Sequence, residues 1–355
     1  MFLLYSGFLT LILLLLALDL GVLNRHAHVV GVREAMAWSL LWMTIALMFG
    51  VFVYYAYGSG WMGLGSAVDP VDHLANDGPR AALKYVTGYL VELSLSVDNL
   101  FVMTVIFSSF AVPGLYQHRV LFWGILGALL MRGSMIAAGA VLIQRFHGIL
   151  YFFGAFLIWT AWRMVRLDVK NPHPENNPVV RMVRRFVPLT SHFHGHSFFV
   201  RAGSAASAAH DRPGADHDRA VEAASPGILM MTPLFLALVV VETCDVIFAV
   251  DSVPAIFSVT ADPFLVFTSN IFAILGLRSL YFALAGMLDR FHLLEIALAI
   301  VLALVGTKML LADFLDQWLG HEYNFWMLAA VVLILAGGVV ASLLIPPKHE
   351  AEAGS

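Results

Sequence analysis

Nine long apolar segments dominate this sequence and limit what it can fold into. A transmembrane helix needs about 20 consecutive, mostly apolar residues. Backbone polar groups in lipid must be satisfied within the segment, and these runs are too long for barrel strands, so we expect helices. The segments cover approximately residues 2–23, 35–57, 83–107, 118–143, 147–166, 228–257, 264–286, 292–313 and 323–345.

The low charge content supports a membrane protein. Only 12% of the 355 residues are charged, against about 25% in a typical soluble domain. The small net charge of -4 and the lack of a basic stripe argue against a nucleic-acid partner. A single cysteine, Cys244, excludes an internal disulfide framework and a cysteine-based zinc site. No Lys or Arg precedes Arg25, so we expect the first segment to be a retained membrane helix rather than a signal peptide.

Basic residues in the loops predict the orientation in a cell (inner or plasma) membrane. Loop 167–227 holds seven Lys and Arg residues, which favours the cytoplasmic side. Counting nine crossings from there places the N-terminus outside and the C-terminus in the cytoplasm. The part of this loop from residue 203 to 227 is rich in Ala, Ser, Asp and His without an apolar period, and we expect it to be flexible.

An internal repeat relates residues 83–166 to residues 228–313. Four features recur in the same order: an acidic pair followed by a polar residue, an arginine in the next segment, an Arg-Phe-His triplet, and a basic residue before methionine. The matched positions are Glu92 with Asp245, Asp98-Asn99 with Asp251-Ser252, Arg132 with Arg278, 145–147 with 290–292, and 163–164 with 308–309.

Each copy contains three segments, an odd number, so the second copy enters the membrane from the opposite side. Inverted repeats are typical of secondary transporters, whose substrate site lies near the midplane where the repeats meet. The alternative is an accidental similarity between apolar helices. The sequence therefore predicts an all-α polytopic membrane bundle with two inverted three-helix repeats, divided into residues 1–82, 83–166, 167–227, 228–313 and 314–355.

Five carboxylates fall within two of the spanning segments. Ionisable residues are costly in a membrane and usually mark a function. They are Glu92 and Asp98 in segment 83–107, and Glu242, Asp245 and Asp251 in segment 228–257. A purely structural role remains the alternative, in which the acids pair with Arg132 and Arg278 and hold the bundle together.

The residue types predict a site for a hard divalent cation. Carboxylates, an amide and a hydroxyl suit Mg, Ca or Mn better than zinc or copper. The expected ligands are Glu92, Asp98, Asn99, Glu242, Asp245, Asp251 and Ser252. Asp251 would point away from the site in a straight helix. Pro254 therefore predicts a break near 250–254 that brings Asp251 inward and frees backbone carbonyls.

A charge count suggests how transport could be coupled. Five carboxylates, two arginines and one divalent ion leave one negative charge, which one bound proton would neutralise. Protons are therefore the candidate counter-ions. We expect no enzyme, because an intramembrane aspartyl protease needs a Gly-x-Gly-Asp motif that the sequence lacks.

Two further features have more than one interpretation. His192, His194 and His196, with His210 and His217 beyond them, could form a regulatory metal site or be solvated loop residues. Asn270, in segment 264–286, could be a ligand or form an interhelical hydrogen bond.

At these motifs the chain resembles the TerC family of integral membrane proteins, named for tellurite resistance. The matching stretches are residues 87–101, 242–254 and 268–281. The resemblance implies a relation to inverted-repeat exporters of the LysE type and Mn(II) efflux as the function. It carries over all five acidic positions, whereas the His- and Ala-rich stretch 192–227 departs from the family.

Two functions follow from these observations. The first is a transporter that exports a divalent cation, with Mn(II) as the substrate that the resemblance implies. The second is a membrane scaffold in a tellurite or metal-stress response complex, in which the acids and arginines only hold helices together. The repeat favours transport.

Overall fold

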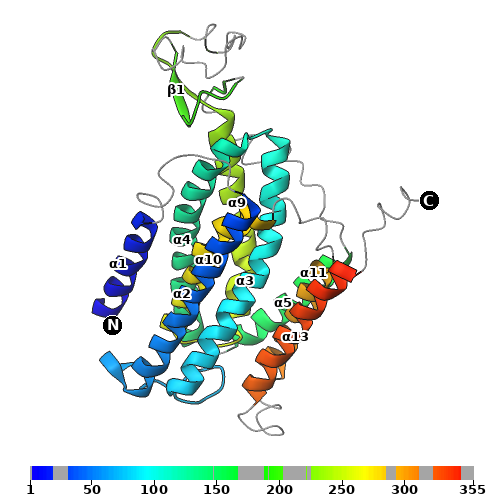
Figure 1. Ribbon diagram of the computed structural model, residues 1–355. Coiled ribbons are helices and arrows are strands. Elements are labelled where there is room, and N and C mark those ends of the chain that lie inside the picture. Colours follow the sequence, from blue (N-terminus) through cyan, green and yellow to red (C-terminus); the bar gives the residue numbers. More distant parts are fainter. Residues whose placement is uncertain are drawn as a thin grey trace, which may run out of the picture.

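The computed structural model describes residues 2–18, 31–146, 148–166, 188–190, 192–202, 221, 225–284, 293–311 and 323–344. Nine α-helices lie within these residues, and each overlaps one predicted apolar segment (Figure 1). They are α1 (Phe2–Leu18), α2 (Val32–Gly58), α3 (Gly78–Ser109), α4 (Gly114–Arg145), α5 (Ile149–Arg166), α9 (Pro233–Phe257), α10 (Pro263–Leu284), α11 (Leu294–Leu310) and α13 (Tyr323–Leu344), with a 3-10 turn, η2 (Trp61–Gly63).

Four of these helices, α2, α4, α9 and α10, are long and apolar enough to cross a membrane. Helices α1, α5, α11 and α13 are apolar but have shorter apolar spans, and α3 is interrupted by ionisable residues. Large apolar side chains are exposed on several helices, including Leu13, Leu40, Leu130, Trp162 and Leu333. Soluble monomers rarely expose apolar surface on this scale, so the chain is a multi-pass membrane protein.

Local sequence explains where two of the helices begin. Asp77 caps α3 by accepting a hydrogen bond from the backbone N–H of Arg80 at 2.9 Å. Helix α9 begins at Pro233, a position where a missing N–H costs nothing. The prediction that segment 228–257 is helical from its start is wrong. Strand β2 (Leu229–Met231) pairs there with β1 (Phe199–Arg201), and the Thr232 hydroxyl donates to the Ser197 carbonyl at 2.8 Å.

The predicted break near Pro254 is also wrong. Helix α9 continues through Pro254 to Phe257. The helix therefore tolerates the loss of the one backbone hydrogen bond that proline cannot donate. Pro254 lies in the last turn of α9, and the backbone N–H of Ser258 donates to its carbonyl at 3.1 Å. The proline therefore falls where the helix is about to end.

The helices of residues 78–166 pack closely against those of residues 233–310. Helix α3 contacts α10 and α9, α4 contacts α9 and α10, and α5 contacts α11. Helix α2 packs beside α3 and α10, while α5, α11 and α13 lie together and pack against α3 and α9 (Figure 1). Aromatic side chains join α1, α2 and α10, with the Phe8 ring centroid 5.4 Å from that of Phe49 and 6.2 Å from that of Phe264.

Two glycines allow α5 and α11 to approach each other closely. A Cβ added at Gly306 would lie 2.7 Å from the Gly154 carbonyl oxygen, whereas one at Gly337 in α13 would meet nothing within 4 Å. Small residues at such crossings let helix backbones come together in membranes. The α5–α11 contact therefore depends on these positions.

We expect Gly306→Ala to lower the free energy of unfolding by about 1–3 kcal/mol, the usual cost of overpacking. Gly337→Ala is the matched control and should be neutral or slightly stabilising, because alanine favours helix. Thermal unfolding of both purified variants in detergent measures the difference. Equal midpoints for the two would show that the close approach does not matter.

Candidate intramembrane cation site

A buried arginine connects the two halves of the bundle. Arg132 on α4 is 1% exposed. Its Nη2 donates to Oδ1 of Asp245 on α9 at 3.0 Å, and its Nε donates to Oδ2 of the same carboxylate at 3.3 Å. Nη1 forms an ion pair with Glu92 on α3 and donates to the Ser252 hydroxyl at 3.2 Å. One guanidinium therefore contacts oxygens from α3 and α9.

Asn99 completes this group. With its amide oxygen turned towards Arg132, Asn99 accepts from Nη2 at 3.1 Å, and its nitrogen donates to the Leu95 carbonyl at 3.3 Å. We call Glu92, Asn99, Arg132, Asp245 and Ser252 the Arg132 cluster. All five are at most 3% exposed. The cluster contains both members of two repeat-matched pairs, Glu92 with Asp245 and Asn99 with Ser252.

Several buried polar atoms have no hydrogen-bond partner among the described residues. They are Oε2 of Glu92, the Ser96 hydroxyl, and both side-chain amide atoms of Asn270, whereas Oε1 of Glu92 forms the ion pair with Arg132. Buried polar groups are normally satisfied. Glu92 and Ser96 are one helical turn apart on α3, so Oε2 of Glu92 and the Ser96 hydroxyl are available to a bound cation.

Two of the predicted ligands cannot be placed. Asp98 and Asp251 lie in helical backbone of α3 and α9, but their side chains are outside the described part of the structure. Arg278, the repeat partner of Arg132, is buried on α10 at 8% exposure. The structure therefore brings together four predicted ligands, Glu92, Asn99, Asp245 and Ser252.

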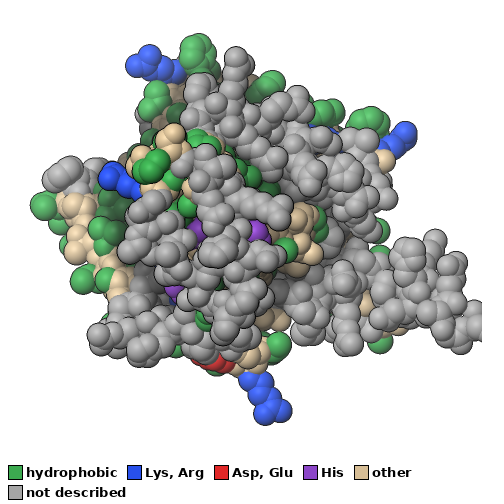
Figure 2. All heavy atoms as spheres, turned by 90° about the horizontal axis from the view of Figure 1, so that it is seen from above, with side chains coloured by type: hydrophobic (Ala, Val, Ile, Leu, Met, Phe, Trp, Pro, Cys, Tyr) green, Lys and Arg blue, Asp and Glu red, His purple; other side chains and the backbone are tan. Residues whose placement is uncertain are grey.

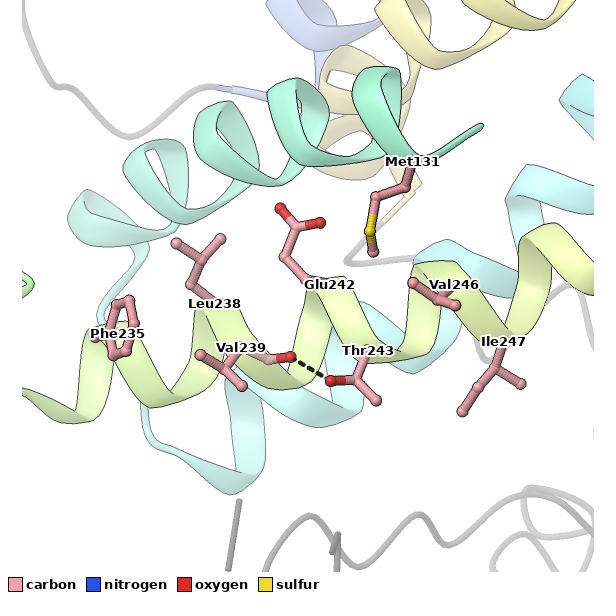
Figure 3. Close-up of a pocket in the computed structure, with 8 residues that line it drawn as sticks. All are labelled: Met131, Phe235, Leu238, Val239, Glu242, Thr243, Val246 and Ile247. Atoms are coloured by element: carbon pink, nitrogen blue, oxygen red, sulfur yellow. Dashed lines mark hydrogen bonds between the residues drawn. The ribbon is translucent and has the colours of Figure 1, made fainter. Parts of the chain in front are cut away.

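Glu242 lies apart from the Arg132 cluster. Its carboxylate points towards α4 in a cavity of about 410 Å³ between α4 and α9 (Figure 3). Apart from Thr243, whose hydroxyl bonds the Val239 carbonyl within the same helix, the lining is apolar. The other lining residues are Met131, Phe235, Leu238, Val239, Val246 and Ile247.

The room for the Glu242 carboxylate is provided by Gly127 on α4. A Cβ added at Gly127 would overlap both Glu242 oxygens and Cδ. Because the overlapping atoms end a flexible side chain beside a cavity, we expect Gly127→Ala to move the Glu242 carboxylate and to cost less than the about 1–3 kcal/mol of overpacking against rigid atoms. That cost should vanish in a Glu242→Ala background, where the overlapping atoms are gone. A double-mutant cycle of unfolding measurements gives the coupling. A coupling of zero would show that the two residues do not compete for space.

The residues whose side chains are described contain no group of three or more His, Cys, Asp and Glu arranged to hold a metal ion. In the Arg132 cluster the guanidinium lies between Glu92 and Asp245.

The histidines of the loop before α9 were the other candidate metal ligands. His194 is buried, and the His196 ring lies 4.9 Å from that of Tyr116. Histidines appear near the middle of the face that Figure 2 shows. His210 and His217 are outside the described residues.

A second buried ionic group, the Lys84 cluster, lies at the end of the bundle where α3 begins. The Lys84 ammonium is 2.8 Å from carboxylate oxygens of both Asp69 and Asp72, and it donates to the Asn76 side-chain oxygen at 2.7 Å. Thr260 donates its hydroxyl to Asp69. These contacts join loop 64–77 to the connection between α9 and α10.

The pKa values of Asp69 and Asp262, two buried carboxyls at this end of the bundle, are shifted in opposite directions. Burial alone would raise the pKa of Asp69, but the Lys84 ammonium and hydrogen bonds from Lys84, Thr260 and the backbone of Ala261 lower it below its ordinary value. Burial raises the pKa of Asp262, although the Tyr57 hydroxyl donates to it at 2.9 Å. Lys84 therefore keeps Asp69 ionised.

The sequence alone did not identify the Lys84 cluster, Gly127 or Ser96 as parts of a site. Lys84 falls at the start of a predicted span, where a basic residue is expected to reach the interface rather than to be buried. Ser96 could have been found, because it follows Glu92 by four residues and so lies on the same helix face. No pattern in the sequence marks Gly127, since its role depends on Glu242 of another helix.

Comparisons with known proteins agree with the motifs. The family model described as "Integral membrane protein TerC family" matches residues 77–350. The "Uncharacterized membrane protein STKORF319" of Myxococcus xanthus is 43% identical over 96% of this chain and 92% of that protein. The Escherichia coli (strain K12) protein named "Putative membrane-bound redox modulator Alx" is 42% identical over 88% of this chain and 87% of that protein. No solved structure matches the chain.

Proposed function

Because the chain belongs to the TerC family of integral membrane proteins, we propose that it exports a hard divalent cation, with Mn(II) as the preferred substrate. The observation that carries the proposal is the Arg132 cluster. Two carboxylates, an amide and a hydroxyl from α3 and α9 meet around one buried point. Hard oxygen ligands of this kind suit Mn, Mg or Ca.

The packing of the helices supports a two-fold repeat, and the odd number of helices in each copy is what favours an inverted one. Exchanging α3 with α9, α4 with α10 and α5 with α11 turns the α3–α10 contact into the α9–α4 contact. The same exchange leaves the contacts α3–α9, α4–α10 and α5–α11 as they are. Such a pattern is expected when two three-helix units face each other, with the substrate site between them.

The basic loop and the charge count supply the remaining parts of the proposal. The seven Lys and Arg residues of loop 167–227 favour a cytoplasmic loop, an external N-terminus and a cytoplasmic C-terminus. The full set of five carboxylates and two arginines is three charges negative, so a divalent ion and one proton would neutralise it. Proton exchange is the coupling that we propose.

Two other functions fit the described residues less well. A scaffold would need neither an unused buried oxygen at each of Glu92 and Ser96 nor matched polar residues from both repeats. The name of the Escherichia coli relative suggests redox modulation. The sequence has one cysteine, half-buried Cys244, so a dithiol couple within this chain cannot form.

Metal content of cells tests the proposal most broadly. Cells that make the protein should accumulate less Mn after exposure to the metal than cells that lack it, and Ca, Mg and Zn measured in the same samples give the selectivity. A scaffold without transport activity predicts the same content of all four metals in both. That result would remove the transport proposal.

A further inference from the structure

Arg132 contacts every predicted ligand whose side chain the structure brings together. Its guanidinium holds both oxygens of Asp245, pairs with Glu92, and donates to Ser252 and Asn99. A divalent cation needs these same oxygens. The guanidinium and a metal ion therefore cannot both make these contacts at the same time.

We propose that Arg132 is a tethered cation that takes the place of the metal when the transporter is empty. The inference rests on the proposed export of a divalent cation and specifies how its site is emptied and reset. Metal entry displaces the guanidinium from Asp245 and Glu92, and metal release lets it return. Arg132 is thus a positioning residue of the transport cycle rather than a ligand.

The membrane explains why an exporter needs such a residue. Uncompensated carboxylates inside a bilayer are costly. To reload, an empty carrier must pass through conformations in which its site is closed to water. A site with only carboxylates would make those closed conformations unfavourable. Arg132 reduces that charge while it remains 1% exposed. Loaded and empty carriers can then both reorient, which net export requires.

The chemistry of arginine suits this role. The guanidinium stays protonated in proteins, so it provides a cation at every step of the cycle and at any working pH. Its planar fork binds a carboxylate with two parallel hydrogen bonds, as Nε and Nη2 do with Asp245. It carries one charge and a metal ion carries two, so the ion can displace it.

Metal binding to the purified protein tests the competition. If Arg132 occupies the site for about nine-tenths of the time, removing it should tighten the apparent Kd for Mn(II) about tenfold. Arg132→Gln is the test variant, and Arg163→Gln is its control, because Arg163 on α5 is exposed and lies over Trp159. Titration calorimetry in detergent gives both values. A folded Arg132→Gln protein that binds Mn(II) no tighter than wild type would overturn the inference.

Transport measurements separate this role from a purely structural one. In proteoliposomes, Arg132→Gln should still exchange internal for external Mn(II), because the loaded carrier reorients, but its net efflux into metal-free buffer should fall at least about tenfold. Wild type should show both. Equal loss of exchange and net efflux, or no loss of either, would contradict the inference. If wild type shows neither, the proposed function itself is wrong.

Arg132→Lys decides the matter if the glutamine variant does not fold. Lysine keeps the charge but lacks the fork that holds both oxygens of Asp245. We expect net efflux to persist and the Kd for Mn(II) to tighten severalfold. A folded lysine variant with unchanged or weaker Mn(II) binding would show that the guanidinium does not compete with the metal.

Discussion

Asp245→Asn should abolish Mn(II) export while folded protein remains in the membrane. The change removes a charged oxygen ligand but keeps the size and polarity of the side chain. Removing one partner of a buried ion pair typically costs about 3–5 kcal/mol, but here Arg132 keeps Glu92 as a counterion. We therefore expect a smaller loss of stability and a loss of export of at least about 100-fold, beyond the about 10- to 100-fold caused by changing residues that only support the ligands.

The control for this variant lies two residues away on the same helix. Among the described residues, the Thr243 hydroxyl bonds the Val239 carbonyl of its own helix, and Thr243 is part of the lining of the side cavity (Figure 3). Thr243→Val should therefore export normally. Membrane abundance is measured by blotting and folding by size-exclusion chromatography in detergent. A folded Asp245→Asn protein with normal export would exclude Asp245 as a ligand.

Lys84→Met should destabilise the protein by about 3–5 kcal/mol near neutral pH. It would leave Asp69 and Asp72 as buried carboxylates without the ammonium that lies 2.8 Å from each. Arg80→Met removes a similar contact to Asp77, but that pair is half-exposed and its loss should cost less than about 1 kcal/mol. Thermal unfolding in detergent compares the two. Equal small losses would show that the Lys84 cluster does not hold this end of the bundle.

The pH dependence of the Lys84 variant provides a second test. In the wild type the pKa of Asp69 lies below its ordinary value, so its contribution to stability is present above the unfolded pKa and is lost as the pH falls through the lower folded pKa. Without Lys84, burial should raise this pKa above its unfolded value. The contribution of Asp69 should then become unfavourable as the pH rises from about 4. The sign of the Asp69 contribution therefore reverses, and unfolding midpoints between pH 3 and 8 measure it. If the unfolding midpoint of Lys84→Met changed with pH as that of the wild type does, the predicted reversal would be contradicted.

The positions of the helices could be predicted because their cause is local. About 20 apolar residues must form a helix in lipid, and each predicted segment overlaps a helix in the described residues. The exact ends could not be predicted, because capping and pairing set them. Segment 228–257 contains β2 near its start, and β2 pairs with β1 about 30 residues earlier in the chain.

The candidate site was harder to predict because it depends on contacts between helices. The sequence identified Glu92, Asn99, Arg132, Asp245 and Ser252 through the repeat. It also raised the pairing of the acids with Arg132, as the structural alternative, but it did not reveal that one guanidinium holds both Glu92 and Asp245, or that Glu242 turns into a side cavity. The repeat match between Arg163 and Lys308 also hides a difference. Arg163 is exposed, whereas Lys308 is buried and donates to the Ser258 carbonyl at 3.1 Å.

The most direct test of the account is Mn(II) flux through the purified protein. Wild-type chain and Asp245→Asn are reconstituted at equal density into liposomes that contain a metal-sensitive dye, and Mn(II) is added outside. We predict a dye response that follows the amount of wild-type protein and that is absent with Asp245→Asn. A wild-type response no greater than that of protein-free liposomes, or an equal response from Asp245→Asn, would contradict cation transport through this site.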